Sequence, residues 1–354
     1  MGGLRAGDEH WRGQFMRWDI GIDLGTRNVR MVTEGAKEAF AQSAALALRA
    51  GEETPLYCGD AAAMLHGRDG AGLEVCFPLA DGTLRNAEHA KALFSWLYGR
   101  AGEASRTRRL RALITCAPFA RPVQQDALLR AALDAGAVEA GLVRSDAATA
   151  VGAGLSILEP AASLLVDVGA GKLSATLFTR GMVAAYAYLP YGVSRIDERL
   201  IRLLRTERGF LIGPRTAEEV KNALASAHGA APVPMRAAGL NLQTRLPMLF
   251  DVEPEMVWRA AEGVLTELVG MVASVVDNAP EELAADLNDA VCVLAGGGAL
   301  ISGLDKRLGD QLGIPVRVAD APLACAGAGL AKILEAPEDY ELLMMEKMAR
   351  AARH

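Results

Sequence analysis

Residues 163–178, with the sequence SLLVDVGAGKLSATLF, predict two β-strands joined by a glycine-rich bend. The apolar run before Asp167 is typical of a fully buried strand, and leucine alternates with small residues over 173–177, as in a second strand. Between them, Gly169 and Gly171 allow a bend whose backbone N–H groups point outward. Such a loop can cradle a phosphate, and the aspartate can hold the Mg²⁺ that accompanies it. This stretch therefore predicts a phosphate-binding hairpin.

One glycine-rich hairpin alone is more often an ordinary tight turn, but the chain contains a second copy. Residues 20–32, IGIDLGTRNVRMV, repeat the buried strand, the aspartate, the glycine and the outgoing strand. In residues 291–300, VCVLAGGGAL, a buried strand runs into a glycine turn that lets a backbone approach a flat or bulky group. Two such hairpins and this turn indicate two related domains that close on one nucleotide from opposite sides.

In order and spacing, these three elements resemble the actin-like ATPase superfamily, and within it the MreB-type bacterial actins. The resemblance covers about residues 19–335 and implies an α/β, two-domain actin-like ATPase fold. Such a fold has duplicated ribonuclease-H-like mixed sheets with helices on both faces and a nucleotide in the interdomain cleft. Five further runs resemble MreB segments in the same order: FPLADG at 77–82, GAGL at 152–155, LIGPRTAEEVK at 211–221, PEELAAD at 280–286 and GGGALISGLD at 296–305.

The expected domain organisation follows the positions of these motifs. We expect an N-terminal arm, two domains that each carry an inserted subdomain, and a Met-rich C-terminal helix that packs on domain I. Residues 206–258 form an insertion because the composition changes there and the phosphate motifs are absent. The expected bounds are 1–18 for the arm, 19–158 for domain I with its insertion at about 33–110, 159–336 for domain II with its adenosine motif at 291–305, and 337–354 for the C-terminal helix.

The resemblance also implies roles for individual residues. Asp23 and Asp167 would hold Mg²⁺, largely through water, and Asp167 would also help to position the attacking water. Residues of the two phosphate loops would contact the phosphates: Gly25, Thr26, Arg27 and Asn28 from the first, and Gly169, Ala170, Gly171 and Lys172 from the second. Other residues would contact the adenosine or the α-phosphate: Glu218, Lys221, Gly296, Gly297, Gly298 and Ala299.

Three stretches depart from the MreB pattern, and one of them is VSRID at 193–197, where the family typically has Gly-Asp-Glu-Met-Asp. Ser145 stands where MreB proteins carry the glutamate that orients the hydrolytic water, and serine cannot polarise water as a carboxylate can. Asp146 lies one residue further on and would need a shifted backbone to replace that glutamate. Lys172 stands where the family usually has threonine, so that it could supply a cation to the phosphates or compete with Mg²⁺. We therefore expect ATP/ADP binding to survive and ATP hydrolysis to be slow or absent, with Asp167, Asp146 and Ser145 as the candidate catalytic residues.

The amino-acid composition argues against several other classes of protein. The 354 residues are 51% hydrophobic and 23% charged, as in a globular protein long enough for two cores. The net charge of −6 argues against general nucleic-acid binding. Five scattered cysteines are typical of buried apolar positions in a reducing compartment, not of a disulfide framework or a metal site. No signal peptide and no membrane-spanning run is evident, so we expect a cytoplasmic protein, at most bound to the inner face of the cell membrane.

The leading functional hypothesis is an MreB-like cytoskeletal protein that binds ATP–Mg²⁺ and forms filaments serving cell shape or wall synthesis. The alternative is a non-filamentous actin-fold regulator that binds nucleotide, and a small-molecule kinase is disfavoured because no additional substrate domain is evident. Expected partners are further copies of the chain and membrane-bound morphogenesis proteins. The N-terminal arm and a basic loop with Arg106, Arg108 and Arg109 could bind an anionic membrane surface. A disordered leader and a solvated loop are the competing interpretations.

Overall fold

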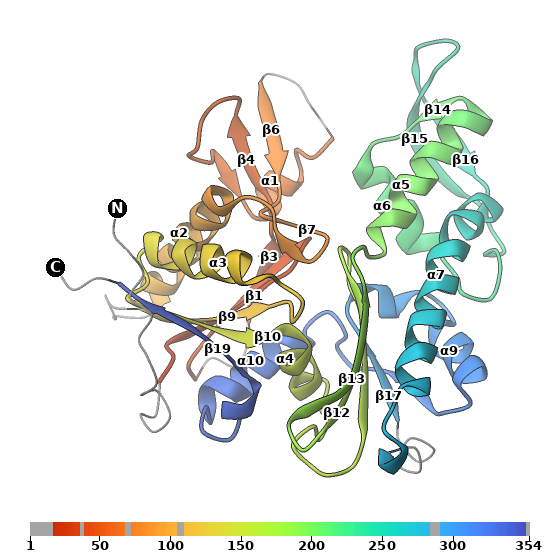
Figure 1. Ribbon diagram of the computed structural model, residues 1–354. Coiled ribbons are helices and arrows are strands. Elements are labelled where there is room, and N and C mark those ends of the chain that lie inside the picture. Colours follow the sequence, from red (N-terminus) through yellow and green to blue (C-terminus); the bar gives the residue numbers. More distant parts are fainter. Residues whose placement is uncertain (1–16, 36–38, 68–71, 105–109, 284–290, 352–354) are drawn as a thin grey trace. The chain divides into compact units, whose positions relative to one another are not determined.

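The computed structural model describes residues 17–35, 39–67, 72–104, 110–283 and 291–351 (Figure 1). The chain divides into two compact units, and each unit has its own hydrophobic core. Unit 1 comprises Met1–Met64, Leu73–Gly154 and Ala324–His354, and unit 2 comprises Leu65–Gly72 and Leu155–Leu323.

Unit 1 is built on a six-stranded sheet with the strand order β19-β10-β9-β1-β2-β3. Strands β1, β2 and β3 form an antiparallel meander, β9 and β10 follow parallel to β1, and β19 closes the sheet antiparallel to β10. The bounds of these strands are β1 (Ile20–Leu24), β2 (Asn28–Thr33), β3 (Phe40–Ser43), β9 (Arg111–Cys116), β10 (Glu139–Arg144) and β19 (Met344–Arg350).

Unit 2 is built on a five-stranded sheet with the order β13-β12-β11-β17-β18. Strands β11, β12 and β13 again form an antiparallel meander, and β17 and β18 again follow parallel to its first strand. The two sheets therefore repeat one topology, which confirms the predicted duplication of a mixed sheet. The bounds are β11 (Ser163–Val168), β12 (Leu173–Thr179), β13 (Met182–Leu189), β17 (Cys292–Ala295) and β18 (Val316–Val318).

Helices cover both faces of the unit 1 sheet, so its central strands are buried on two sides and read as continuous apolar runs (Figure 1). Helices α2 (Ala87–Ala104) and α3 (Pro122–Asp134) lie on one face, and α4 (Ser145–Gly152) and α10 (Cys325–Glu335) lie on the other. Close packing of α4 on α10 requires glycine, because a Cβ at Gly152 would overlap the backbone of α10.

In unit 2, the long helix α7 (Pro254–Asp277) packs its apolar side against β12 and β13. Proline at its first position fits because the N–H that proline lacks would have no partner inside the helix. The remaining elements of unit 2 are α5 (Ser194–Leu203), a π-helical turn (Leu204–Arg208), β14 (Phe210–Leu211), α6 (Pro214–Leu224), β15 (Met235–Asn241), β16 (Pro247–Val252), a 3₁₀ turn (Gly297–Leu300) and α9 (Leu304–Leu312).

Small elements complete unit 1. Strands β5, β4 and β6 form one small sheet, and β7 pairs with β8. The expected burial of the cysteines is confirmed for Cys116, Cys292 and Cys325, whereas Cys58 and Cys76 are only partly buried. The bounds are β4 (Leu46–Arg49), β5 (Tyr57–Cys58), α1 (Asp60–Ala63), β6 (Leu73–Cys76), β7 (Leu79–Ala80) and β8 (Thr83–Leu84).

The C-terminal segment differs from its prediction. The expected amphipathic helix over residues 340–350 is wrong, because the segment forms a short 3₁₀ turn (Glu341–Leu343) and then strand β19. In β19, Ala349 reaches the core and the Lys347 ammonium lies 2.8 Å from the Asp126 carboxylate of α3. The seven residues fit a period of two as well as a helical period, and pairing with β10 decides between them.

Several expected boundaries also shift. The sequence predicts Trp18 in an N-terminal arm, but its side chain is 3% exposed and fills the space beside Gly141 of β10. Helix α10 groups with unit 1 instead of ending the second domain at residue 336. Strand β3 belongs to the main sheet, so the first insertion starts after residue 43 and not at 33.

The sequence predicts a basic loop over residues 100–111, but α2 continues through Arg100 to Ala104. Arg106, Arg108, Arg109 and residues 1–16 of the arm lie outside the described residues. Within the described ranges, no helix combines the length and the apolar character needed to cross a membrane.

Candidate nucleotide-binding site

The hairpin between β1 and β2 is the predicted first phosphate loop. The Gly25 N–H donates a hydrogen bond of 3.0 Å to the Asn28 carbonyl, which closes a tight turn with Thr26 and Arg27 at its tip. A Cβ at Gly25 would lie 2.7 Å from that carbonyl oxygen, so any side chain there would force the turn open. Asp23 stands two residues before the turn, at the end of β1.

The hairpin between β11 and β12 has the same construction. The Gly169 N–H donates to the Lys172 carbonyl at 2.9 Å, and a Cβ at Gly169 would lie 3.0 Å from that oxygen. Asp167 again stands two residues before the glycine. The structure thus confirms two hairpins with matching turns and matching aspartates, one in each unit.

The start of α5 orients the peptide groups of the second loop. The N–H groups of Val193 and Ser194 donate to the carbonyls of Gly169 and Ala170, each at 3.0 Å. In a trans peptide the next N–H points opposite to the carbonyl, so the N–H groups of Ala170 and Gly171 point away from α5. Two successive N–H groups aimed in one direction form a suitable site for a phosphate oxygen.

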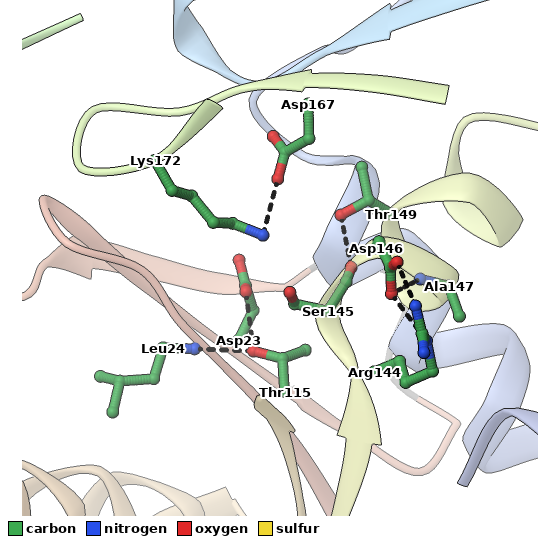
Figure 2. Close-up of polar contacts among 10 residues, drawn as sticks. All are labelled: Asp23, Leu24, Thr115, Arg144, Ser145, Asp146, Ala147, Thr149, Asp167 and Lys172. Atoms are coloured by element: carbon green, nitrogen blue, oxygen red, sulfur yellow. Dashed lines mark hydrogen bonds and ion pairs between the residues drawn. The ribbon is translucent and has the colours of Figure 1, made fainter. Parts of the chain in front are cut away.

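Asp167 is 9% exposed and lies at the end of the buried strand β11. Its Oδ2 lies 3.2 Å from the Lys172 Nζ (Figure 2). The hairpin register places Asp167 opposite Ser174 and Lys172 in the turn just before β12, so this ion pair spans the base of the loop. The second phosphate loop therefore carries its own basic side chain beside the aspartate.

Asp23 contacts Thr115 and Arg30, two residues of unit 1, and Figure 2 shows its hydrogen bond with Thr115. The Thr115 hydroxyl donates to Asp23 Oδ1 at 3.0 Å and accepts the Leu24 N–H at 3.2 Å. The Arg30 guanidinium lies 3.8 Å from Asp23 Oδ2. The sequence motifs did not identify Thr115 or Arg30, and only the pairing of β1 with β9 and β2 brings them to the aspartate.

Ser145 and Asp146 begin helix α4, and their environments differ. Ser145 is partly exposed, whereas Asp146 is 0% exposed. The Arg144 Nε and Nη2 donate to the two Asp146 carboxylate oxygens at 3.1 and 2.7 Å, and the Ala147 N–H donates to Oδ1 at 2.9 Å (Figure 2). Both carboxylate oxygens of Asp146 thus accept hydrogen bonds, and the carboxylate forms a buried ion pair at the start of α4.

The glycine turn after β17 packs on the second phosphate loop. Gly296 has φ +82°, and a Cβ there would lie 2.7 Å from Asp167 Oδ1 and 2.6 Å from the Val168 carbonyl oxygen. A Cβ at Gly298 would overlap the Val168 side chain, and one at Gly297 would lie 3.0 Å from Leu323. Ala299 is 2% exposed. These glycines therefore allow the turn to pack against the end of β11, and their contact with an adenosine stays a prediction.

Lys221 and Glu218 lie one turn apart on α6. The Lys221 side chain is 7% exposed, and its Nζ donates to Asp197 Oδ2 of α5 at 2.9 Å. Glu218 is partly exposed. Lys221 thus joins two helices through a buried ion pair, and its contact with ribose or base stays a prediction.

The residues fit a phosphate better than they fit a directly bound Mg²⁺. Both loops have glycine at the position where a side chain would obstruct the turn, and the second loop directs two N–H groups away from α5. Each expected metal ligand, however, already faces a basic side chain. Among the described residues, no group of three or more His, Cys, Asp or Glu side chains could hold a metal ion.

The fold has known counterparts that define its class. MreB5 of Spiroplasma citri bound to ADP matches with a TM-score of 0.84 at 24% identity, over 91% of this chain and 97% of that chain. A chain of the MamK double helical filament matches with a TM-score of 0.75 at 21% identity, over 89% and 98%. The repeated sheet topology is that of an actin-like protein, which confirms the predicted fold class.

Sequence comparison defines the family within that class. The model of the family described as MreB/Mbl protein matches residues 17–342. The cell shape-determining protein MreB of Escherichia coli (strain K12) is 31% identical over 331 residues, which cover 92% of this chain and 95% of that protein. The cell shape-determining protein Mbl of Bacillus subtilis (strain 168) is 28% identical over 318 residues, 90% of this chain and 96% of that protein. The chain belongs to the MreB/Mbl family.

Proposed function

We propose that this protein binds an adenine nucleotide through the phosphate loops of both units and assembles with further copies into filaments that organise cell shape or wall synthesis. The observation that carries the proposal is the pair of matching hairpins, each with an aspartate, a turn-closing glycine and a tip free of bulky apolar residues.

The relatives support both parts of the proposal. Matching structures include MreB5 of Spiroplasma citri bound to ADP and to AMPPNP, and the MamK double helical filament. The curated relatives are described as cell shape-determining proteins. The family likeness extends over nearly the whole chain, which favours a shared assembly surface as well as a shared nucleotide site.

Hydrolysis is proposed to be slow. Ser145 offers a hydroxyl where a carboxylate would be needed to polarise water. Asp146 is the nearest carboxylate on that helix, and its two oxygens are engaged by Arg144 and the Ala147 N–H. Using Asp146 as a base would first require breaking a buried ion pair, so we expect nucleotide binding without efficient turnover.

Membrane attachment belongs to the same proposal and rests on the composition of two segments. The N-terminal arm and the arginines at 106, 108 and 109 combine basic and aromatic residues in the manner of an interfacial segment. Filaments attached in this way would lie at the inner face of the cell membrane and could meet membrane-bound morphogenesis proteins there.

High-speed pelleting followed by negative-stain microscopy tests the proposal. The purified protein is compared with ATP, with ADP, without nucleotide and with anionic liposomes. We expect ordered protofilaments that require nucleotide. Gly25→Val should abolish them, because a side chain there meets the Asn28 carbonyl, whereas Gly213→Ala, in open space at a negative φ, should not.

A protein that binds nucleotide yet stays monomeric at every concentration and with every lipid would contradict the filament and favour the regulator. The departures at Ser145 and Lys172 are the features that would suit such a regulator. A protein that binds no nucleotide would contradict the nucleotide site itself.

A further inference from the structure

A row of arginines follows helix α5 and the π-helical turn after it. Its members are three or four residues apart, and we call them the arginine row: Arg195, Arg199, Arg202, Arg205 and Arg208. The last three are exposed, and none of these three forms an ion pair with any residue that the structure describes. The Glu207 carboxylate, which follows Arg205 closely in the sequence, is already bound by Arg259 of α7 at 2.7 Å.

The arginine row does little for the helix that carries it. Like charges three or four residues apart on a helix repel each other, and Arg195 lies in the first turn, where the helix dipole disfavours a cation. Partial burial and the charges of Arg195 and Arg202 lower the pKa of Arg199, so these three guanidinium groups gather on one side of α5. Arg199 has a long ion pair of 3.8 Å with Glu267. Most of the positive charge of the row is therefore not compensated within the described part of unit 2.

The segment that joins α10 to β19 has the opposite charge. Residues 335–341, EAPEDYE, contain no basic residue, and we call them the acidic turn. Two backbone hydrogen bonds hold its shape: the Asp339 N–H donates to the Ala336 carbonyl at 3.1 Å, and the Leu343 N–H donates to the Tyr340 carbonyl at 3.0 Å. Four carboxylates of the turn are exposed and form no ion pair with any described residue: Glu335, Glu338, Asp339 and Glu341.

Charge complementarity indicates what these two surfaces bind. Several other exposed carboxylates face a basic neighbour, such as Glu52, which lies 3.7 Å from Arg49. The acidic turn and the arginine row both lack such compensation, and a guanidinium group can donate two parallel hydrogen bonds to a carboxylate. Leu342, directly after the turn, is 71% exposed and adds apolar surface for a contact. The chain therefore carries both halves of a charged contact, one in each unit.

We propose that the arginine row of one copy binds the acidic turn of the next copy in a filament. The two surfaces differ, so the contact is head-to-tail and leaves one surface of each kind for a further copy, which is how an open filament grows. This inference rests on the proposed assembly into filaments and specifies one contact within it.

Two charge-reversal variants test the contact by pelleting at saturating ATP. The first replaces Arg202, Arg205 and Arg208 by glutamate, and the second replaces Glu338, Asp339 and Glu341 by lysine. Each variant alone should raise the critical concentration for assembly by about tenfold or more, because like charges then face each other. An equimolar mixture should restore the wild-type value with equal amounts of both variants in the pellet. Each reversed surface then meets an opposite charge on the other variant.

The control variant replaces Arg49, Arg215 and Arg236 by glutamate, which gives the same net charge as the first variant and should assemble like the wild type. Anisotropy with a fluorescent ATP analogue should give the same nucleotide affinity for every variant, and thermal unfolding verifies that each one folds. Restoration in the mixture shows a contact between copies, because another chain cannot repair a contact within one chain.

The salt dependence of the wild-type protein tests the contact without any variant. Raising NaCl from about 50 to about 500 mM at saturating ATP should raise the critical concentration by about tenfold, since exposed charges are screened at high salt. A critical concentration that salt leaves unchanged would overturn the inference.

Two further results would overturn the inference and leave the proposed filament intact. One is a reversal variant that assembles like the wild type, and the other is a mixture that stays as impaired as each variant alone. If the first variant assembles normally and loses only its binding to anionic liposomes, the arginine row binds a lipid surface instead. A wild-type protein that binds nucleotide and stays monomeric would remove the proposed filament and this inference with it.

Discussion

Because Gly296 has no side chain, the glycine turn after β17 can pack directly against Asp167 at the second phosphate loop. Gly296→Ala places a methyl group at positive φ, 2.7 Å from Asp167 Oδ1. We expect the free energy of unfolding to fall by about 2–4 kcal/mol, from backbone strain and overpacking, and nucleotide affinity to fall with it. Urea unfolding and nucleotide titration measure the two effects.

Gly270→Ala is the control, since Gly270 lies within α7 and no atom lies within 4 Å of the place where its Cβ would stand. That variant should stabilise the protein by about 1 kcal/mol through helix propensity. A Gly296→Ala protein as stable as the wild type would show that the turn does not pack on Asp167 as described.

Ser145 is the position at which the proposal of slow hydrolysis can be tested. Ser145→Glu supplies a carboxylate at the start of α4, and we expect phosphate release from ATP to rise by at least about tenfold. Ser145→Gln has the same shape without the charge and should leave the rate unchanged. Phosphate release under single-turnover conditions measures both.

Asp146→Ala tests the alternative hypothesis, in which Asp146 is the base for hydrolysis. It leaves the Arg144 guanidinium without its buried partner, so we expect a loss of about 3 kcal/mol in stability and no specific effect on phosphate release. If Ser145→Glu fails to raise the rate while Asp146→Ala abolishes it in a folded protein, Asp146 is the working base.

Among the elements, β19 shows how tertiary pairing stabilises a segment with ambiguous periodicity. Deleting residues 344–354 exposes the edge of β10 and removes Ala349 from the core. We expect a lower melting temperature and a red-shifted Trp18 emission, because Trp18 packs on Gly141 of β10. Deleting residues 352–354 alone is the control, and equal behaviour of the two truncations would contradict the role of β19.

The link between α7 and α9 gives a pH-dependent prediction. Arg307 donates to both Glu262 oxygens at 2.7 and 2.9 Å, and these hydrogen bonds hold the pKa of Glu262 below its ordinary value. A carboxyl group with a lowered pKa stabilises the folded state fully above its ordinary pKa of about 4.3, and this stabilisation is lost as the pH falls from there through the lowered pKa of the folded state.

Glu262→Gln should therefore reduce the free energy of unfolding at pH 7 by only about 0.5–1 kcal/mol, because the pair is partly exposed, and should have little effect near pH 3. Asp310→Asn, which removes an exposed acidic charge from α9, controls for net charge. Urea unfolding at both pH values makes the comparison. A deficit that persists at acid pH would show that the ion pair is not its source.

At the scale of the whole molecule, attachment to a membrane depends on charge. Replacing Arg106, Arg108 and Arg109 by serine should weaken co-sedimentation with anionic liposomes at low salt, since each charge near such a surface contributes about 1 kcal/mol. The control replaces Arg49, Arg215 and Arg236, three exposed arginines of other elements, with the same change in net charge. Equal losses in both triple variants would remove the basic segment from the membrane proposal.

The sequence by itself determined the duplicated mixed sheets, both hairpins with glycine turns and the family. Buried parallel strands require long apolar runs, and a tight turn that cradles a phosphate requires glycine at fixed places, so both leave local patterns. The pattern at residues 163–178 was sufficient because it recurs at 20–32.

Only the tertiary structure decided how the charged side chains pair. Asp23 accepts a hydrogen bond from Thr115, which lies 92 residues further along the chain, and no local sequence pattern predicts that contact. The strand at 344–350 likewise depends on β10 for its hydrogen bonds, since its own residues fit either period. Ion pairs and edge strands are stabilised by residues that are distant in the sequence. The conformation of a glycine turn or a buried apolar strand is instead determined by its own residues.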